Sequence, residues 1–196
     1  MYLRLFYTIF LEENMPKVFL SPSLQEFNPY VGGGNEEYYA NLIADAMEPY
    51  LRASGIDFDR NEPSQTLSQA VAQSNADNYD LHFAIHSNAA GEGNSGNVRG
   101  ADFYYYPTSS NGQRFAEILS ENYKDVYPLP DRVKSLPTTS LFEVRRTKAP
   151  SVLAEVAYHD NVEDADFIRN NIDSIARNLS KSIAEYLSVP FVDVGA

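Results

Sequence analysis

The sequence predicts a single α/β domain, built on a mainly parallel, twisted sheet with helices on both faces. Its 196 residues suit one domain with a sizeable core, and 43% of them are hydrophobic, as in ordinary globular proteins. Short apolar runs alternate along the chain with segments of helical periodicity, which is typical of α/β folds. Several runs are apolar at both parities, as in parallel strands that are covered on both sides.

Four apolar runs predict buried strands, and three apolar stripes predict helices. The strands are expected at residues 18–20, 80–86, 102–106 and 151–156. The stripes are Tyr39, Ile43, Met47 and Tyr50; then Phe115, Ile118, Leu119 and Val126; then Ile168, Ile172, Ile175, Leu179 and Ile183. Asn161 is placed to cap the last helix, with Glu163 and Asp164 in its first turn, where the helix dipole favours acidic residues.

The charge balance limits the classes of partner. The formal net charge is −12, with only 15 Lys and Arg residues, so a basic surface for nucleic acid or an anionic membrane is not expected. The chain has no cysteine, which excludes disulfides and thiolate ligands. Any metal site must therefore use His, Asp, Glu or amide oxygens.

The first 16 residues are expected to lie outside the domain, which then covers residues 17–190. Residues 3–11 are largely apolar, but two glutamates follow directly and no small-residue cleavage site is present. This segment is a poor signal peptide and too short to span a bilayer, and we expect no membrane insertion elsewhere. An alternative is that translation begins at Met15, which stands directly before the first expected strand. The sequence therefore predicts synthesis in the cytoplasm and release by an unknown route.

Two of the three histidines lie in one predicted strand. His82 and His86 share a face of that strand, but about 13 Å of extended chain separates them, so both cannot bind one metal. His86 stands at the carboxyl end of the strand, where sites form in open α/β sheets. It is either a ligand or a polar strand cap. His82 lies deeper in the sheet and is interpreted as structural.

Two glutamates stand where a carboxylate needs a partner. Glu36 lies on the apolar stripe of the first helix, whereas Glu37 points almost the opposite way. A metal would be one partner for Glu36; the alternative is a frayed helix start that leaves it in water. Glu155 lies inside an apolar strand, where burial raises a carboxyl pKa and suits a general acid or base. The alternative is a structural salt bridge to Arg145 or Arg146.

These segments, in this order, resemble the zinc-dependent N-acetylmuramoyl-L-alanine amidases of the Amidase_3 type over about residues 17–187. The most specific match is Ile85-His86-Ser87-Asn88-Ala89, the strand-end histidine with its following asparagine. The other matching segments are Asn35-Glu36, Gly55, Ser74-Asn75 with Tyr79-Asp80-Leu81, Gly100–Tyr106, and Ala149-Pro150-Ser151-Val152-Leu153-Ala154-Glu155 with its Pro-x-x-Leu-x-Glu pattern.

The resemblance implies an enzyme that cuts the amide between N-acetylmuramic acid and L-alanine in peptidoglycan, acting on the bacterial cell wall as a monomer. Glu36 and His86 would hold zinc, which polarises the scissile carbonyl and acidifies a water. Glu155 would take the proton from that water and pass it to the leaving amine. Asn88 and Arg145 are candidate substrate contacts.

The chain departs from the family at one ligand. A Gly-His that usually follows the first strand is absent, and direct register puts Leu24 where the zinc-binding histidine should be. Gln25 is the first candidate to replace it through its amide oxygen, His159 the second, and no third protein ligand the last possibility. The alternative functions are a non-catalytic peptidoglycan-binding domain and a zinc peptidase that acts on the stem peptide.

Overall fold

The computed structural model describes residues 15–195, and its centre is a six-stranded sheet of order β2-β1-β3-β6-β4-β5. The strands are β1 (Lys17–Pro22), β2 (Asp57–Arg60), β3 (Leu81–Asn88), β4 (Ala101–Tyr105), β5 (Val133–Pro137) and β6 (Ser151–Tyr158). Strands β2, β1, β3 and β6 are parallel, whereas β4 pairs antiparallel with β6 and parallel with β5. The predicted fold class, a mainly parallel sheet, is confirmed.

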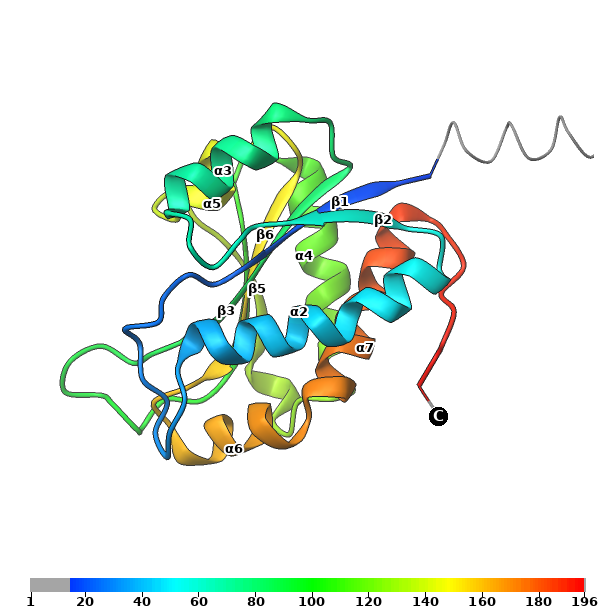
Figure 1. The fold of residues 1–196 in the computed structure, drawn as a ribbon. Helices are drawn as coiled ribbons and strands as arrows, with labels where there is room; N and C mark the ends of the chain where they lie inside the picture. Colours follow the sequence, from blue (N-terminus) through cyan, green and yellow to red (C-terminus); the bar gives the residue numbers. More distant parts are fainter. Residues whose placement is uncertain (1–14, 196) are drawn as a thin grey trace, which may run out of the picture.

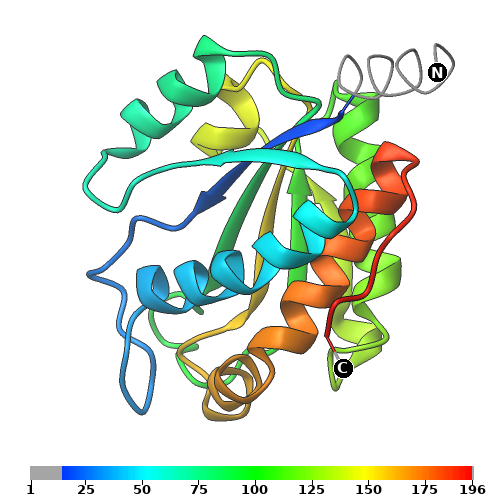
Figure 2. The same cartoon turned by 45° about the vertical axis from the view of Figure 1, so that its right-hand side comes forward.

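Helices cover both faces of the sheet, as the sequence predicts (Figures 1 and 2). One face carries α2 (Glu36–Ala53), α4 (Ser110–Tyr123) and α7 (Ile172–Leu187). The opposite face carries α3 (Leu67–Ala76) and α5 (Phe142–Arg146), while α6 (Val162–Asn170) directly precedes α7 and a 3-10 turn, Pro130–Arg132, precedes β5. No helix within residues 15–195 has both the length and the hydropathy needed to cross a bilayer.

The two faces of the sheet differ in what they bury. Phe83 and Ile85 of β3 join the large hydrophobic core under α2, α4 and α7. The alternate residues of the same strand, His82, Ala84 and His86, face α3 and α5, where the hydrophobic cluster is small. The polar chemistry of the strands is therefore concentrated on the thinly covered face.

Several elements differ from the prediction. Strands β2 and β5 form the two edges of the sheet, and edge strands need no continuous apolar run, so neither was predicted. The single helix expected over residues 168–183 is wrong, because the chain breaks at Asn171 into α6 and α7. The Asn171 side chain donates to the carbonyl of Phe167 at 2.7 Å and so competes with the helical hydrogen bonds. Helices α3 and α5 were also not predicted.

Asp164, in the first turn of α6, does more than complement the helix dipole. Asn161 caps the helix as predicted, but Asp164 itself is fully buried. Its carboxylate accepts hydrogen bonds from the Tyr127 hydroxyl at 2.8 Å and from Arg99 Nε at 2.8 Å. It also accepts from the backbone N–H groups of Gly100 and Tyr158. One carboxylate thus ties together the segment before β4, the end of β6 and the start of α6.

We expect Asp164→Ala to lower the free energy of unfolding by roughly 3–5 kcal/mol, because it leaves buried donors without their anion. Asp166→Ala is the matched control on the same helix, since Asp166 is exposed and its one ion pair among the described residues is with Arg169. This substitution should lower the free energy of unfolding by no more than about 0.5 kcal/mol. Urea denaturation measures both. Equal losses in the two variants would contradict the anchoring role.

Candidate metal and catalytic site

The candidate site lies at the carboxyl edge of β1, β3 and β6. His86 of β3 pairs in register with Glu155 of β6, so both side chains lie on the face under α5. Asp102 pairs with Glu155 from the other side, because the antiparallel β4 begins at this edge. The N-terminus of α2 brings Glu36 to the same edge, where Asn35 caps the helix by accepting from the N–H of Tyr38.

Glu36 is 2% exposed and lies against His86, so the frayed-start interpretation is wrong. Its Oε1 is 2.7 Å from His86 Nδ1, and its Oε2 accepts from Asn28 Nδ2 at 2.7 Å. Burial opposes ionisation, but the hydrogen bonds from His86 and Asn28 outweigh it and lower the pKa of Glu36. Glu37 is less buried, which agrees with the predicted phase of the helix.

The Gln25 side chain reaches the Glu36–His86 pair, but it points its amide nitrogen, and not its amide oxygen, toward them. The amide nitrogen is 3.4 Å from Glu36 Oε1 and 3.3 Å from His86 Nδ1, whereas the amide oxygen accepts from Asn28. A carboxylate attracts an N–H and repels a carbonyl oxygen, which explains this orientation. The amide would have to turn to offer its oxygen to a metal.

His159 is placed elsewhere. Its Nδ1 is 2.8 Å from the carbonyl oxygen of Ser87 and 3.0 Å from the Ser87 hydroxyl, and its ring stacks on Tyr30 with centroids 5.1 Å apart. Tyr30 belongs to the large core under α2. In the part of the chain that the structure describes, no hydrogen bond joins His159 to Glu36 or His86. The structure therefore brings Gln25, and not His159, to the candidate ligands.

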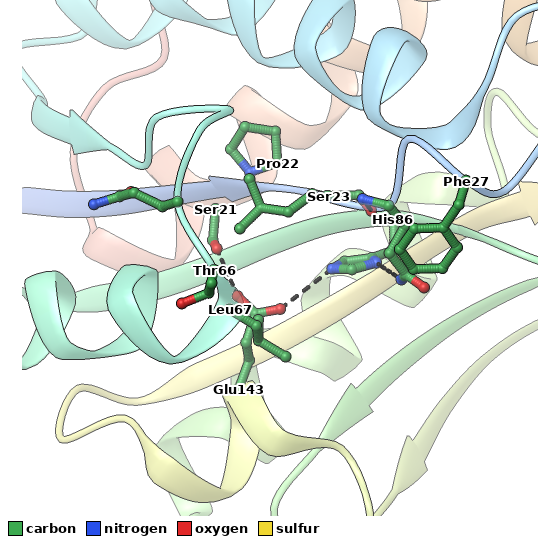
Figure 3. A pocket seen from close by; sticks show the side chains of 11 residues that line it. Ser21, Pro22, Ser23, Phe27, Thr66, Leu67, His86 and Glu143 are labelled. Atoms are coloured by element: carbon green, nitrogen blue, oxygen red, sulfur yellow. Dashed lines mark hydrogen bonds and ion pairs between the residues drawn. The ribbon is translucent and has the colours of Figure 1, made fainter.

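Glu143 on α5 is a site residue that the sequence reasoning missed. It is 2% exposed, and its Oε2 lies 3.2 Å from His86 Nε2. Its Oε1 accepts from the Ser21 hydroxyl at 2.5 Å (Figure 3). The same oxygen lies 3.1 Å from His82 Nε2. His82 is fully buried and its Nδ1 is 2.9 Å from Ser74 Oγ, which agrees with the structural interpretation of His82.

In the cluster of Glu36, Glu143 and His86, the carboxylates and the imidazole stabilise one another's charged forms. Burial opposes ionisation of Glu143, but hydrogen bonds from His82 and His86 outweigh it and hold the pKa of Glu143 well below its usual range. Burial alone would lower the pKa of His86, but Glu143 and Glu36 raise it well above its usual value. The sequence contained one signal for Glu143, a carboxylate between Phe142 and Val144, but α5 is too short to show a helical period.

Glu155 is partly buried, and its Oε2 is buried without a hydrogen-bond partner among the described residues. Burial raises its pKa to about 7, an effect that His86 opposes and Glu36 supports. It faces a cavity of about 200 Å³, whose other lining residues are Asn88, Tyr104, Thr138, Ser140 and Leu141.

The salt-bridge interpretation of Glu155 is wrong. Arg145 and Arg146 are both exposed on α5, and within residues 15–195 neither forms an ion pair with Glu155. Of the two candidate substrate contacts, Asn88 lines the cavity of Glu155 and Arg145 does not. Glu155 is therefore a partly buried carboxyl group whose Oε2 accepts no hydrogen bond from residues 15–195, an arrangement that suits a general base.

A second cavity, of about 390 Å³, lies on the side of His86 that faces α3. Its apolar lining comes from Pro22, Leu24, Phe27 and Leu67, and both His86 and Glu143 reach it. Phe27 is 73% exposed. His86 thus borders an open groove as well as the buried Glu36.

The donor set fits a cation bound by two strong ligands and one weak ligand. The carboxyl groups of Glu36 and Glu143 contact His86, and Glu155 pairs with it in register. Asp102 lies on the other side of Glu155, and burial raises the pKa of Asp102. Among the described residues, no three His, Asp or Glu side chains converge closely enough to hold a metal. The neutral amide of Gln25 would serve as a third donor at the Glu36–His86 pair only after turning its oxygen toward the metal. Zinc commonly binds carboxylate oxygens and imidazole nitrogens, such as those of Glu36 and His86. The excess of carboxylates in the cluster also favours binding of a cation.

Comparison with known proteins identifies relatives of one kind. The model of the family Amidase_3, N-acetylmuramoyl-L-alanine amidase, matches residues 27–185. The chain is 29% identical over 148 residues to the N-acetylmuramoyl-L-alanine amidase LytC of Bacillus subtilis (strain 168). It is 28% identical over 141 residues to the N-acetylmuramoyl-L-alanine amidase CwlM of Bacillus licheniformis. These matches cover 72% and 70% of this chain but only 29% and 53% of the two relatives, so the chain spans part of their length.

Solved structures share the fold at low sequence identity. An N-acetylmuramoyl-L-alanine amidase from Clostridium difficile 630 superposes with a TM-score of 0.79 at 16% identity, covering 89% of this chain and 98% of that one. The catalytic domain of CwlV from Bacillus (Paenibacillus) polymyxa var. colistinus gives 0.77 at 20% identity, covering 90% and 100%. Since the family model spans most of the domain and the strand-end motif around His86 lies inside it, this chain belongs to the N-acetylmuramoyl-L-alanine amidase family Amidase_3.

Proposed function

We propose that the protein is a zinc-dependent hydrolase that cleaves the amide between N-acetylmuramic acid and L-alanine in the peptidoglycan of the bacterial cell wall. The observation that carries the proposal is the Glu155 Oε2, which has no partner in the part of the chain that the structure describes and lies on the strand beside His86, in an amidase-family fold. Glu36 and His86 would hold the metal, with Gln25 as a weak third donor. Bound zinc would supply a Lewis acid that polarises the scissile carbonyl and lowers the pKa of a nearby water.

Glu155 would act as the general base and then as the general acid. With a pKa of about 7 it exchanges protons near neutral pH, and no group within residues 15–195 donates a hydrogen bond to its buried Oε2. It would accept the proton of the attacking water and return it to the alanine amine as the amide breaks. The Asn88 amide, which lines the same cavity, would orient the substrate.

The first test separates the two neighbouring glutamates. We expect about one zinc per chain, bound at least tenfold more weakly by Glu36→Gln, because the variant loses the anionic ligand. The same variant should lose muropeptide cleavage, whereas Glu37→Gln should retain both zinc and cleavage. Elemental analysis and chromatography of digested muropeptides measure the two properties. Zinc retained in Glu36→Gln would remove Glu36 from the site; a wild-type protein that binds muropeptide but no zinc would favour the non-catalytic binding domain.

The second test concerns the weak third donor. Gln25→His should tighten zinc binding about tenfold, about 1.4 kcal/mol, because imidazole is a stronger donor than an amide, and Gln25→Ala should weaken it. His159→Ala is the matched comparison and should leave zinc affinity unchanged, since Ser87 and Tyr30 hold that ring. Chelator competition measures all three. A loss of zinc in His159→Ala with none in Gln25→Ala would reverse the assignment.

The third test distinguishes a catalytic Glu155 from a structural one. Glu155→Gln should lower the cleavage rate by roughly 10²–10⁴. Burial raises the folded-state pKa from its ordinary 4.5 to about 7, so the carboxyl costs no stability below about pH 4.5. The cost grows with pH and is complete above about pH 7, where Glu155→Gln should therefore stabilise the metal-free protein by roughly 1–3 kcal/mol. Urea denaturation at pH 4 and pH 8 in a chelator measures it; a destabilised variant at pH 8 would indicate a structural role.

A further inference from the structure

We infer that Glu143 is a positioning residue for the metal ligand His86. Its carboxylate holds the Nε2–H of the imidazole, so that the ring presents Nδ1 toward Glu36 and Gln25. The inference rests on the proposed zinc site, because it assigns Nδ1 as the nitrogen that would bind the metal.

The two carboxylates contact opposite edges of one ring. Glu36 Oε1 is 2.7 Å from Nδ1, and Glu143 Oε2 is 3.2 Å from Nε2. The ring nitrogens of an imidazole point away from each other, so a single ion at Nδ1 can be shared with Glu36 but not with Glu143. Glu143 is therefore not the missing third ligand. A metal-bound histidine commonly donates its other N–H to a carboxylate, which fixes the ring and makes it a more basic ligand.

Glu143 is itself held in place. Its Oε1 accepts from the Ser21 hydroxyl, which leaves Oε2 for His86 (Figure 3). The same Oε1 also contacts His82 Nε2. His82 is anchored in turn by Ser74 of α3. The direct contacts come from β1 and β3, and α3 supports one of them through His82, so the carboxylate is held in place although it is only 2% exposed. A merely space-filling residue at this position would have no need of a charge.

The weak third donor makes such orientation important in this chain. Where the family usually has a histidine, this chain has Leu24 and the neutral amide of Gln25. Metal affinity must then come mainly from Glu36 and His86. An ionised Glu143 on Nε2 strengthens the imidazole and prevents the ring from turning away.

Chelator competition with zinc tests the inference. Glu143→Gln keeps the shape of the side chain but removes its charge, and we expect zinc affinity to fall about 10–100-fold. Arg146→Gln is the matched control on the same helix, because Arg146 is exposed; its zinc affinity should equal that of the wild type. Thermal melts of both variants establish that the fold is retained. If Glu143→Gln does not fold, Ser21→Ala removes one hydrogen bond from Glu143 and should weaken zinc binding by a smaller factor.

Nitrogen-15 NMR of the imidazole rings tests the Glu143–His86 contact independently of metal binding. With only three histidines the spectrum is simple, and His86→Gln assigns the ring. We expect a slowly exchanging, hydrogen-bonded Nε2 proton on His86 in the wild type, which exchanges rapidly in Glu143→Gln. If the wild type binds no zinc, the proposed function fails, whereas the NMR comparison on metal-free protein still tests the contact. An unchanged Nε2 signal together with unchanged zinc affinity in Glu143→Gln overturns the inference.

Discussion

The in-register pairing of β3 with β6 positions His86 beside Glu155, and the rest of the site is assembled around that pair. Side chains alternate between faces along a strand, so a slip of one residue would move either group into the large hydrophobic core. The pairing also sets which residues α5 meets, because Ala84, Val144 and Leu153 form the small cluster that holds this helix. The β3–β6 register therefore determines both which side chains meet at the edge of the sheet and how α5 packs over them.

The two faces of the sheet have different tasks. Under α2, α4 and α7 a large apolar core supplies stability, whereas under α5 the strands carry histidines and carboxyl groups. Glu155 lowers the stability of the second face, because burial raises its pKa and none of the described residues donates a hydrogen bond to its Oε2. Sites that keep a reactive group unpartnered commonly lower stability, and the opposite core offsets this cost.

His86 contacts side chains from two parts of the site, those that follow β1 and the one on α5. Glu36 and Gln25 reach it from the loop and helix that follow β1, and Glu143 reaches it from α5. The family fold is retained in solved structures at 16–20% identity, so the backbone tolerates wide variation around this centre. In the proposed metal site, Gln25 would replace a strong ligand with a weak one, which would place more of the metal binding on His86 and on Glu143, which contacts it.

The sequence by itself determined the fold class, the phase that buries Glu36 and the placement of His86 at a strand end. These three features follow from sequence periodicity, because the spacing of apolar residues along a long helix or strand shows which of its faces is buried. Tertiary structure alone decided the edge strands and the place of Glu143. Glu143 meets Ser21 across 122 positions of the chain, from a helix of five residues. No local spacing records such a contact, because it depends on strand order, register and the path of the loops that bring distant segments together.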